Sequence, residues 1–387
     1  MQHKGNKKKK RRFRFFRFLN VLIILFLIGY GFYIFTTPKN VRELKKLKYS
    51  NDAIEIIIDK NLDEYIINKK AYSKTLDVAL VKGGYKEEYL EEYLNLPYKN
   101  YDEYIIHVNE LNNLNYTRTS VLSIINKLDK SEIETIIENE IVLDNITSYF
   151  DNKYFKIDNL GRYANYKKKN EKYDIDTVIS YVNMYLDYPL YGHDIEIADV
   201  DNLLVIANKY YKLGKDYVPK DLVTIDAKYR NSYNHQVRSI VKENYQKMAE
   251  DMFKIGLHPT VTSSYRSYST QKILYDAEVA ANGVTYADKY SARPGYSEHQ
   301  TGLAIDVKDG SGNYAFFKNS DEYKWMKDNA HKYGFILRYP EGKEHITGYA
   351  FEAWHYRYVG VDIATYIYEN DLTFDEYYMM FIANKKD

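Results

Sequence analysis

The stretch from Ser291 to Val307, SARPGYSEHQTGLAIDV, decides the fold of the C-terminal half of this chain. It holds His299 and Asp306, seven residues apart, with a glycine and the small apolar run 303–305 between them. That run is suited to a short strand. An imidazole and a carboxylate separated by a rigid spacer are typical of a metal site.

A third ligand is available downstream in the segment Phe351–His355, FEAWH, where Glu352 precedes His355 by three positions. His299, Asp306 and His355 offer two imidazoles and one carboxylate, which suits one zinc ion per chain with a fourth position left open for water. Glu352 is then the candidate base. On an ideal strand, residues three apart face opposite sides, so Glu352 and His355 can reach one metal only if a bulge or strong twist intervenes.

Length and composition indicate a folded protein with a basic N-terminal tail. The chain has 387 residues, 45% of them hydrophobic, which is enough for two domains and a core. The formal net charge is +1, yet residues 1–17 carry nine Lys or Arg and no acid, so the remainder carries −8. The basic character is confined to this tail, and we expect no nucleic-acid partner. The absence of cysteine excludes a disulfide framework and a lipid-modified cysteine anchor.

A charge-free run rich in Leu, Ile and Phe follows the tail, from Phe18 to Pro38. It is long enough to span a bilayer, which needs about 20 apolar residues. A cleavable signal peptide is the alternative, but its apolar core is usually about 7 to 15 residues long and ends in a small-x-small site, which this run lacks. We therefore expect a cytoplasmic tail over 1–17 and a single-pass anchor over 18–37 in the cell membrane. By the positive-inside rule, the rest of the chain lies outside the cell.

Residues 38–190 carry the pattern of short helices, with apolar residues at three- and four-residue spacing among acids and lysines. Three of the helix starts are alike, because a tyrosine precedes each one, and two of them have Ser or Thr in the N-cap position. These tyrosines are Tyr49, Tyr85 and Tyr116, spaced by 36 and 31 residues. The pattern predicts an all-α region. It is either a degenerate helical repeat that makes a stalk or binding surface, or an irregular bundle without a ligand.

Residues 196–387 alternate between helix and strand patterns. Helices are expected over 234–255, from 272 through 280, and over 321–333. Strands are expected over 259–264, 303–305, 335–339 and 350–359. The predicted fold class is α+β, with a small antiparallel sheet and flanking helices in this domain.

Three motifs in this domain support a resemblance to a known family. S-x-H-x-x-G-x-A-x-D is complete over 297–306, E-x-W-H over 352–355, and S-x-Y-R-S-x-x-x-Q over 263–271. With them the chain resembles the zinc D-alanyl-D-alanine carboxypeptidases of the VanY type, over roughly 202–377. The resemblance implies a carboxypeptidase that removes the terminal D-alanine from peptidoglycan stem peptides in cell-wall remodelling.

The resemblance also implies a role for each motif residue. The metal ligands are His299, Asp306 and His355. Glu352 takes a proton from the attacking water and returns it to the leaving amine. Arg266 stabilises the developing oxyanion, and Gln271 and Ser297 hold the terminal residue of the substrate.

Two other classes of function remain as alternatives. A non-hydrolytic peptidoglycan-binding or regulatory protein could keep the metal fold, although an intact Glu352 argues against it. A serine carboxypeptidase could use Ser269 of the S-x-x-K segment 269–272, but no K-T-G motif follows. D,D- and L,D-specificity both stay open, and the same ligands can take other divalent metals. We expect the other histidines to be packing or surface residues, with His345 the one to examine first.

Overall fold

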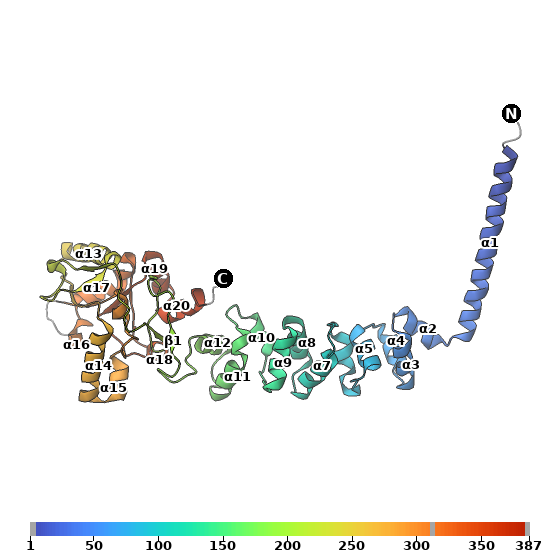
Figure 1. Cartoon of the computed structure of the whole chain (residues 1–387), viewed down its shortest axis with the longest axis horizontal. Helices are drawn as coiled ribbons and strands as arrows, with labels where there is room; N and C mark the ends of the chain where they lie inside the picture. Colours follow the sequence, from blue (N-terminus) through green and yellow to red (C-terminus); the bar gives the residue numbers. More distant parts are fainter. Residues whose placement is uncertain (1–4, 310–313, 384–387) are drawn as a thin grey trace. The chain divides into compact units, whose positions relative to one another are not determined.

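The computed structural model describes residues 5–309 and 314–383, and the chain divides into two compact units, 1–151 and 152–387. The first unit begins with helix α1 (Gly5–Thr36) (Figure 1). Its segment Phe15–Thr36 is 22 residues long and apolar enough to cross a membrane. At 1.5 Å per residue it spans about 33 Å, close to the thickness of a hydrocarbon core. This helix covers the apolar run from which we predicted the anchor.

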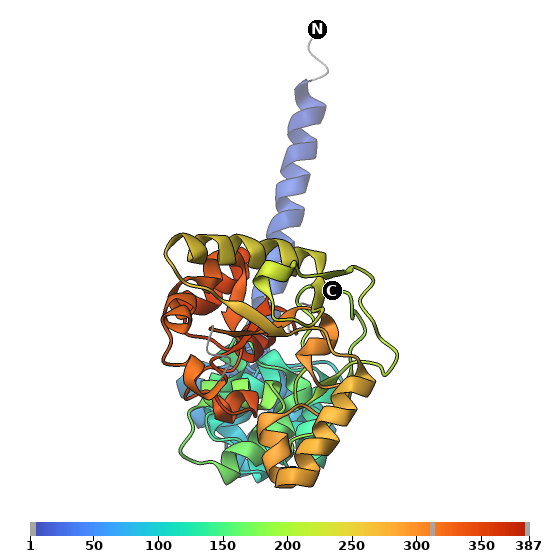
Figure 2. The same cartoon turned by 90° about the vertical axis from the view of Figure 1, so that its left-hand side faces the viewer.

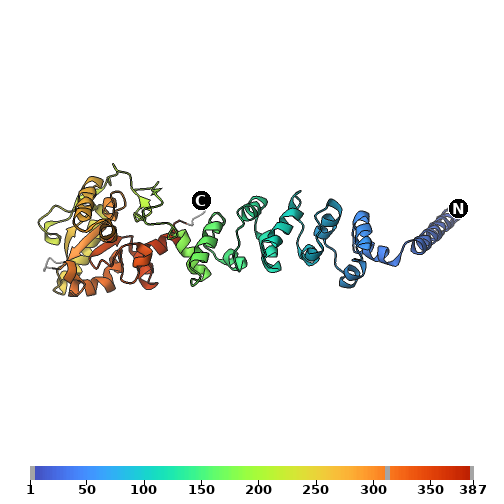
Figure 3. The same cartoon turned by 90° about the horizontal axis from the view of Figure 1, so that it is seen from below.

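Short α-helices make up the rest of the first unit (Figure 3). They are α2 (Lys39–Lys46), α3 (Asn51–Asp59), α4 (Asp63–Lys69), α5 (Lys74–Lys82), α6 (Leu90–Asn95), α7 (Tyr104–Asn113), α8 (Arg118–Lys127), α9 (Lys130–Glu138) and α10 (Ile146–Asp151). Helices two apart in the sequence pack together, as α2 does with α4 and α3 with α5. The predicted N-caps are confirmed, because the hydroxyls of Ser50 and Thr117 accept from the backbone N–H groups of Ala53 and Ser120, both at 3.2 Å.

One local arrangement occurs in both units. In the first unit, the Tyr93 hydroxyl donates to Asn109 Oδ1 (2.6 Å), and Asn109 Nδ2 donates to a backbone carbonyl. In the second unit, Tyr163 donates to Asn183 Oδ1 (2.7 Å), and Asn183 Nδ2 again donates to a carbonyl. A backbone N–H seven residues earlier donates to each tyrosine hydroxyl. The shared pattern supports a degenerate helical repeat over a bundle of unrelated helices.

The second unit combines helices with small sheets, which confirms the α+β prediction. Its helices are α11 (Leu160–Lys169), α12 (Ile175–Asn183), α13 (Ser239–Lys254), α14 (Tyr268–Asn282), α15 (Val284–Tyr290), α16 (Tyr314–Phe317), α17 (Asp321–Asn329), α18 (Glu344–Thr347), α19 (Val361–Glu369) and α20 (Phe374–Phe381). Its strands are β1 (Ile195–Glu196), β2 (Tyr211–Lys212), β3 (Leu222–Thr224), β4 (Gln236–Arg238), β5 (Thr260–Ser263), β6 (Ala304–Lys308), β7 (Phe335–Leu337) and β8 (His355–Tyr358). The main sheet has the order β5-β6-β8-β7 and is antiparallel throughout.

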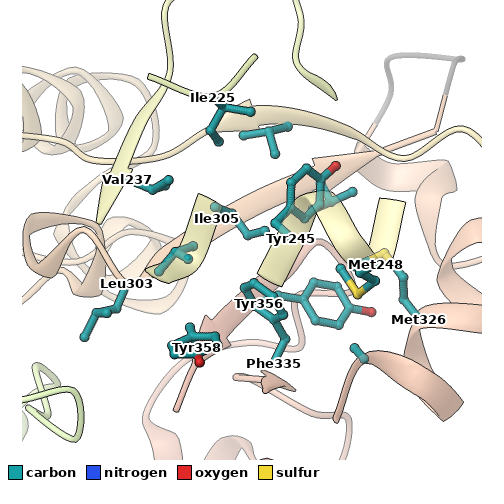
Figure 4. Packing of buried hydrophobic residues seen from close by; sticks show 14 of the residues in the cluster. Ile225, Val237, Tyr245, Met248, Leu303, Ile305, Met326, Phe335, Tyr356 and Tyr358 are labelled. Carbon is teal, nitrogen blue, oxygen red and sulfur yellow. The ribbon is translucent and has the colours of Figure 1, made fainter. Parts of the chain in front are cut away.

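Helix α13 covers one face of this sheet and builds the core with it (Figures 2 and 4). Successive side chains on a strand point to opposite faces, so alternate residues of β6 and β8 meet the helix. Ile305 of β6 and Tyr356 of β8 are cross-strand partners, and both are fully buried in one cluster with Tyr245 and Met248 of α13. Each such side chain contributes about 1.5 to 3 kcal/mol. The intervening residues are left to face the other side of the sheet.

Two expected elements begin five residues later than predicted. The helix expected over 234–255 starts only at Ser239, because 236–238 pair with β3 as strand β4 and bury Val237. The strand expected over 350–359 is limited to β8, since the preceding residues form a turn.

The boundary expected near residue 190 lies within the second unit. There Met184, which follows α12, packs with Ile346 of α18 and Met379 of α20. The placement of a domain boundary at 190 therefore stays a prediction.

Candidate metal centre

Strand register brings two of the predicted ligands together on the sheet face opposite α13. Asp306 of β6 and His355 of β8 are direct cross-strand partners, which puts their Cβ atoms about 5 Å apart. His299 lies in the 3₁₀ turn Glu298–Thr301 just before β6. Gly302 then turns the chain into the strand at φ +68, where a Cβ would lie 3.0 Å from Leu222. The left-handed turn thus returns His299 to the side chain of Asp306.

The three side chains converge on Asp306 Oδ1. His299 Nε2 lies 3.3 Å from it and His355 Nδ1 lies 3.1 Å from it, and one ligand atom from each residue falls within 4.8 Å of the others. All three residues are buried. Asp306 Oδ1 accepts no hydrogen bond from the described residues, although it is buried. A buried carboxylate oxygen between two imidazoles fits a divalent metal ion, which these residues could hold.

The electrostatics of the cluster favour a bound cation. Burial, with Arg266 adding to it, lowers the pKa of His299 to about 4, so its ring is neutral and suited to ligation. Its Nδ1 donates to the Ser264 carbonyl (2.8 Å), which leaves the Nε2 lone pair facing Asp306. Burial disfavours a charged His355, yet the carboxylates of Asp306 and Glu298 outweigh it and raise the pKa of His355 to about 9. The carboxylates therefore attract positive charge to this point.

Glu352 lies in a turn immediately before β8. Its N–H donates to the Tyr339 carbonyl (3.1 Å), and its own carbonyl accepts from the His355 N–H (3.4 Å). Residues three apart on one ideal strand would face opposite sides, but here only His355 is in the strand. The turn therefore lets Glu352 and His355 face the same site. Glu352 Oε2 lies 3.7 Å from His355 Nδ1. Burial, with Asp306 adding to it, raises the pKa of the Glu352 carboxyl to about 7.

Arg266 is fixed toward the cluster by the turn between β5 and α14. Its Nε donates to Gln271 Oε1 (2.9 Å), its Nη1 donates to Ser263 Oγ (2.6 Å), and the same Nη1 lies 3.7 Å from Asp306 Oδ2. Gln271 in turn donates to the Ala292 carbonyl (2.8 Å). A register shift in β5 places Ser263 opposite Asp306, and such bulges re-aim side chains beside active sites.

The remaining predicted residues fall in two places. Ser297 is buried at the start of the 3₁₀ turn that carries His299, two positions before it. His345 lies away from the cluster on α18, where its Nε2 is 2.9 Å from the Tyr181 hydroxyl of α12.

Sequence reasoning missed Glu298, which is buried beside His299 in sequence and beside His355 in space. Its Oε1 accepts from Arg338 Nε (2.8 Å) and Arg357 Nη1 (2.9 Å). Burial alone would raise the pKa of Glu298, but the two guanidinium groups outweigh it and hold that pKa well below its usual range. Arg338, which lies in the strand expected over 335–339 and directly follows β7, and Arg357 of β8 were the available signal for a buried carboxylate.

Three comparisons with known proteins indicate the same family. A family model described as "VanY: D-alanyl-D-alanine carboxypeptidase" matches residues 234–361. YodJ of Bacillus subtilis (strain 168) is 43% identical over 188 residues, which cover 47% of this chain and 69% of YodJ. The bifunctional D-Ala-D-Ala dipeptidase and D-Ala-D-Ala carboxypeptidase VanXYC of Enterococcus gallinarum is 33% identical over 184 residues, which cover 46% of this chain and 94% of VanXYC.

A solved structure of a mutant of the vancomycin-resistance D,D-pentapeptidase VanY, in complex with Zn(II), is 32% identical, with a TM-score of 0.39. The match covers 45% of this chain and 97% of that chain. The sequence matches cover most of YodJ and VanXYC. The residues matched by the family model, 234–361, include His299, Asp306 and His355. The chain therefore belongs to the VanY family of D-alanyl-D-alanine carboxypeptidases.

Proposed function

We propose that this protein is a zinc-dependent carboxypeptidase that removes the terminal D-alanine from peptidoglycan stem peptides. The observation that carries the proposal is the buried convergence of His299, Asp306 and His355 on one point beside a carboxyl group of raised pKa. Family membership supports the substrate class, since relatives are named for D-Ala-D-Ala carboxypeptidase activity. D,D- and L,D-cleavage both fit this chemistry.

In this proposal, His299, Asp306 and His355 hold the zinc ion. Zinc supplies Lewis-acid chemistry, because it lowers the pKa of a water molecule and polarises a carbonyl group. Two imidazoles and one carboxylate leave a coordination position open, as catalytic zinc sites require. The donor set is nitrogen and oxygen only, so other divalent metals can compete for it in vitro.

Glu352 moves the proton. Its carboxylate takes a proton from the attacking water and delivers it to the nitrogen of the leaving D-alanine. A pKa of about 7 is suited to this work, because a base is most effective when its pKa lies near the working pH. A non-hydrolytic protein has no need of a base beside the metal ligands, so the presence of Glu352 argues against such a role.

Arg266 and its partners bind and orient the substrate. The guanidinium carries a fixed charge 3.7 Å from Asp306, so it can stabilise negative charge on the oxygen of the scissile carbonyl. Gln271 holds Arg266 through Nε. We assign Gln271 and Ser297 to the binding of the terminal residue of the stem peptide.

The test is hydrolysis of purified pentapeptide and tetrapeptide muropeptides by the full-length protein in detergent. We expect release of D-alanine from one or both, loss of release with a chelator, recovery with zinc, and no inhibition by β-lactams. Glu352→Gln should keep about one zinc per chain while turnover falls about 10²- to 10⁴-fold. Asp306→Ala should lower the zinc content itself. Activity that persists in chelator, or a Glu352→Gln protein with wild-type turnover, contradicts the proposal.

We further propose that α1 anchors the protein in the cell membrane with residues 1–17 in the cytoplasm. The support is the apolar segment Phe15–Thr36, which follows a stretch, residues 1–14, with eight basic residues and no acid. The peptidase domain then lies on the outer side of the cell membrane, on the same side as the peptidoglycan stem peptides. Protease added to intact cells should remove the peptidase domain and leave a short membrane-held stub. Recovery of the full-length chain in the soluble cytosolic fraction would refute the anchor.

A further inference from the structure

A buried cluster of four charges lies directly behind the metal centre. Glu298 and Arg338 are both almost fully buried, and so are Arg357 and Asp375. Arg338 joins the two carboxylates, since its Nε donates to Glu298 and its Nη1 donates to Asp375 Oδ2 (2.6 Å). Arg357 donates to Glu298 and to three backbone carbonyls. Two positive and two negative charges compensate one another here, as buried charges must.

One carboxylate oxygen of this cluster takes no part in the compensation. Glu298 Oε1 accepts from both arginines, whereas Glu298 Oε2 faces His355 Nε2 at 3.6 Å. Both of these facing atoms are buried, and neither has a hydrogen-bond partner within the described residues. The other ring nitrogen of His355, Nδ1, is the atom that faces Asp306. The imidazole of His355 therefore lies between Glu298 and the metal point, which is the place where the ligand atoms of His299, Asp306 and His355 converge.

We propose that Glu298 is a positioning residue, which accepts the Nε2 proton of His355 and so presents the Nδ1 lone pair to the metal. The inference rests on the proposed metal site. A separation of 3.6 Å is longer than a hydrogen bond, so we expect it to shorten when the metal is held. His299 has the equivalent support from the Ser264 carbonyl. Carboxylate or carbonyl partners of this kind fix the tautomer of a ligating histidine.

Glu298→Gln tests this role because the two arginines determine the orientation of the new side-chain amide. Arg338 and Arg357 both donate to the Oε1 position, so the amide oxygen is held there and the NH₂ group is turned toward His355 Nε2. A donor at that place favours a lone pair on Nε2 and a proton on Nδ1. This is the tautomer that cannot ligate through Nδ1.

The matched control is Asp375→Asn, which removes the other carboxylate of the same cluster. Asp375 pairs with Arg338 but does not face a ligand. We expect both variants to lose thermal stability, while only Glu298→Gln binds zinc about 10- to 100-fold more weakly in competition with a chromophoric chelator. Equal zinc affinities for the two variants would show that Glu298 only balances the arginines, and would overturn the inference.

A measurement on the wild-type protein covers the case in which Glu298→Gln does not fold. Full-length protein labelled with ¹⁵N at histidine, loaded with zinc in detergent, should show one histidine bound through Nδ1 with a downfield Nε2–H proton. Zinc binding with His355 ligated through Nε2 overturns the inference and leaves the proposed function standing. If the wild-type protein binds no zinc, the proposed function fails as well, so the two failures are distinguishable.

Discussion

Lys209 is a buried cation whose cost to folding can be measured through pH. The residue is 1% exposed, and its ammonium group forms no salt bridge with a carboxylate in the described part of the chain. Its Nζ donates to the Asp288 carbonyl and the Tyr191 hydroxyl and lies 3.5 Å from the centre of the Tyr349 ring. These partners stabilise the charge only in part, because none of them carries a full negative charge. Burial lowers the pKa of Lys209 to about 7.

The sign and size of the pH dependence of stability follow from the pKa of Lys209 in the folded and in the unfolded state. The unfolded chain holds the Lys209 proton up to its usual pKa of about 10.4, whereas the folded protein releases it near 7. Between these values the unfolded state binds more protons, so stability rises with pH. One pKa unit corresponds to about 1.36 kcal/mol, so the gain between pH 7 and pH 9 is about 2 kcal/mol. Below pH 7 the gain disappears, since both states are then protonated.

The assay is urea unfolding of wild type and Lys209→Met at pH 7, 8 and 9, in the presence of chelator. The chain has two tryptophans, Trp325 and Trp354, both in the second unit, so their fluorescence reports unfolding of that unit within the full-length protein. We expect wild type to gain about 2 kcal/mol relative to Lys209→Met from pH 7 to pH 9. Loss of the hydrogen bonds of Lys209 adds an offset that does not depend on pH.

The control is Lys332→Met, which removes an exposed lysine of the same unit. The difference between wild type and this control should be the same at all three pH values. If the difference in unfolding free energy between wild type and Lys209→Met is also the same at all three pH values, the Lys209 ammonium is solvated or paired in the folded protein. The reasoning from burial would then be wrong.

Three further predictions concern the site and its support. Arg266→Lys keeps the charge but loses the planar fork, so turnover should fall about 10²-fold with zinc content unchanged, as measured by metal analysis and D-alanine release. Gly334→Ala forces a side chain into φ +86 and places its Cβ 2.6 Å from the Tyr358 ring, so urea unfolding should show a loss of about 1 to 3 kcal/mol. The fragment 196–387 should fold and hydrolyse substrate, but its melting temperature should be lower than that of 152–387, because it lacks the apolar contacts of α12. Equal melting temperatures would show that those contacts contribute nothing.

The metal point could be predicted because its residues belong to short motifs. His299 and Asp306 lie within one strand and its preceding turn, so their spacing alone limits how far apart they can be. His355 is 49 positions later, and no local pattern indicates that β8 pairs with β6 in the register that sets it opposite Asp306. Its inclusion rested first on residue type, since a histidine that follows a carboxylate by three positions offers a third ligand beside a base, and then on the motif E-x-W-H of the family resemblance.

Residues that act through tertiary contacts could not be predicted from local patterns. Glu298 acquires its environment from Arg338, which directly follows β7, and from Arg357 of β8. Periodicity also predicted too early a start for the helix at 234–255. Residues 236–238 are polar, apolar and polar in turn, and this order fits either a helix or a strand. Pairing with β3 decides between them, and that partner is set by the tertiary fold.

The charge cluster behind the metal point also specifies the register of the central strands. A slip of one residue between β6 and β8 would turn every side chain of one strand to the opposite face. Arg357 would then enter the apolar layer under α13 without Glu298, at a cost of about 3 to 5 kcal/mol for a broken buried pair. In the observed register, Arg357 lies opposite Ala304, whose small side chain leaves room beside it. The carboxylate that we assign to His355 therefore also holds the pairing that places His355 opposite Asp306.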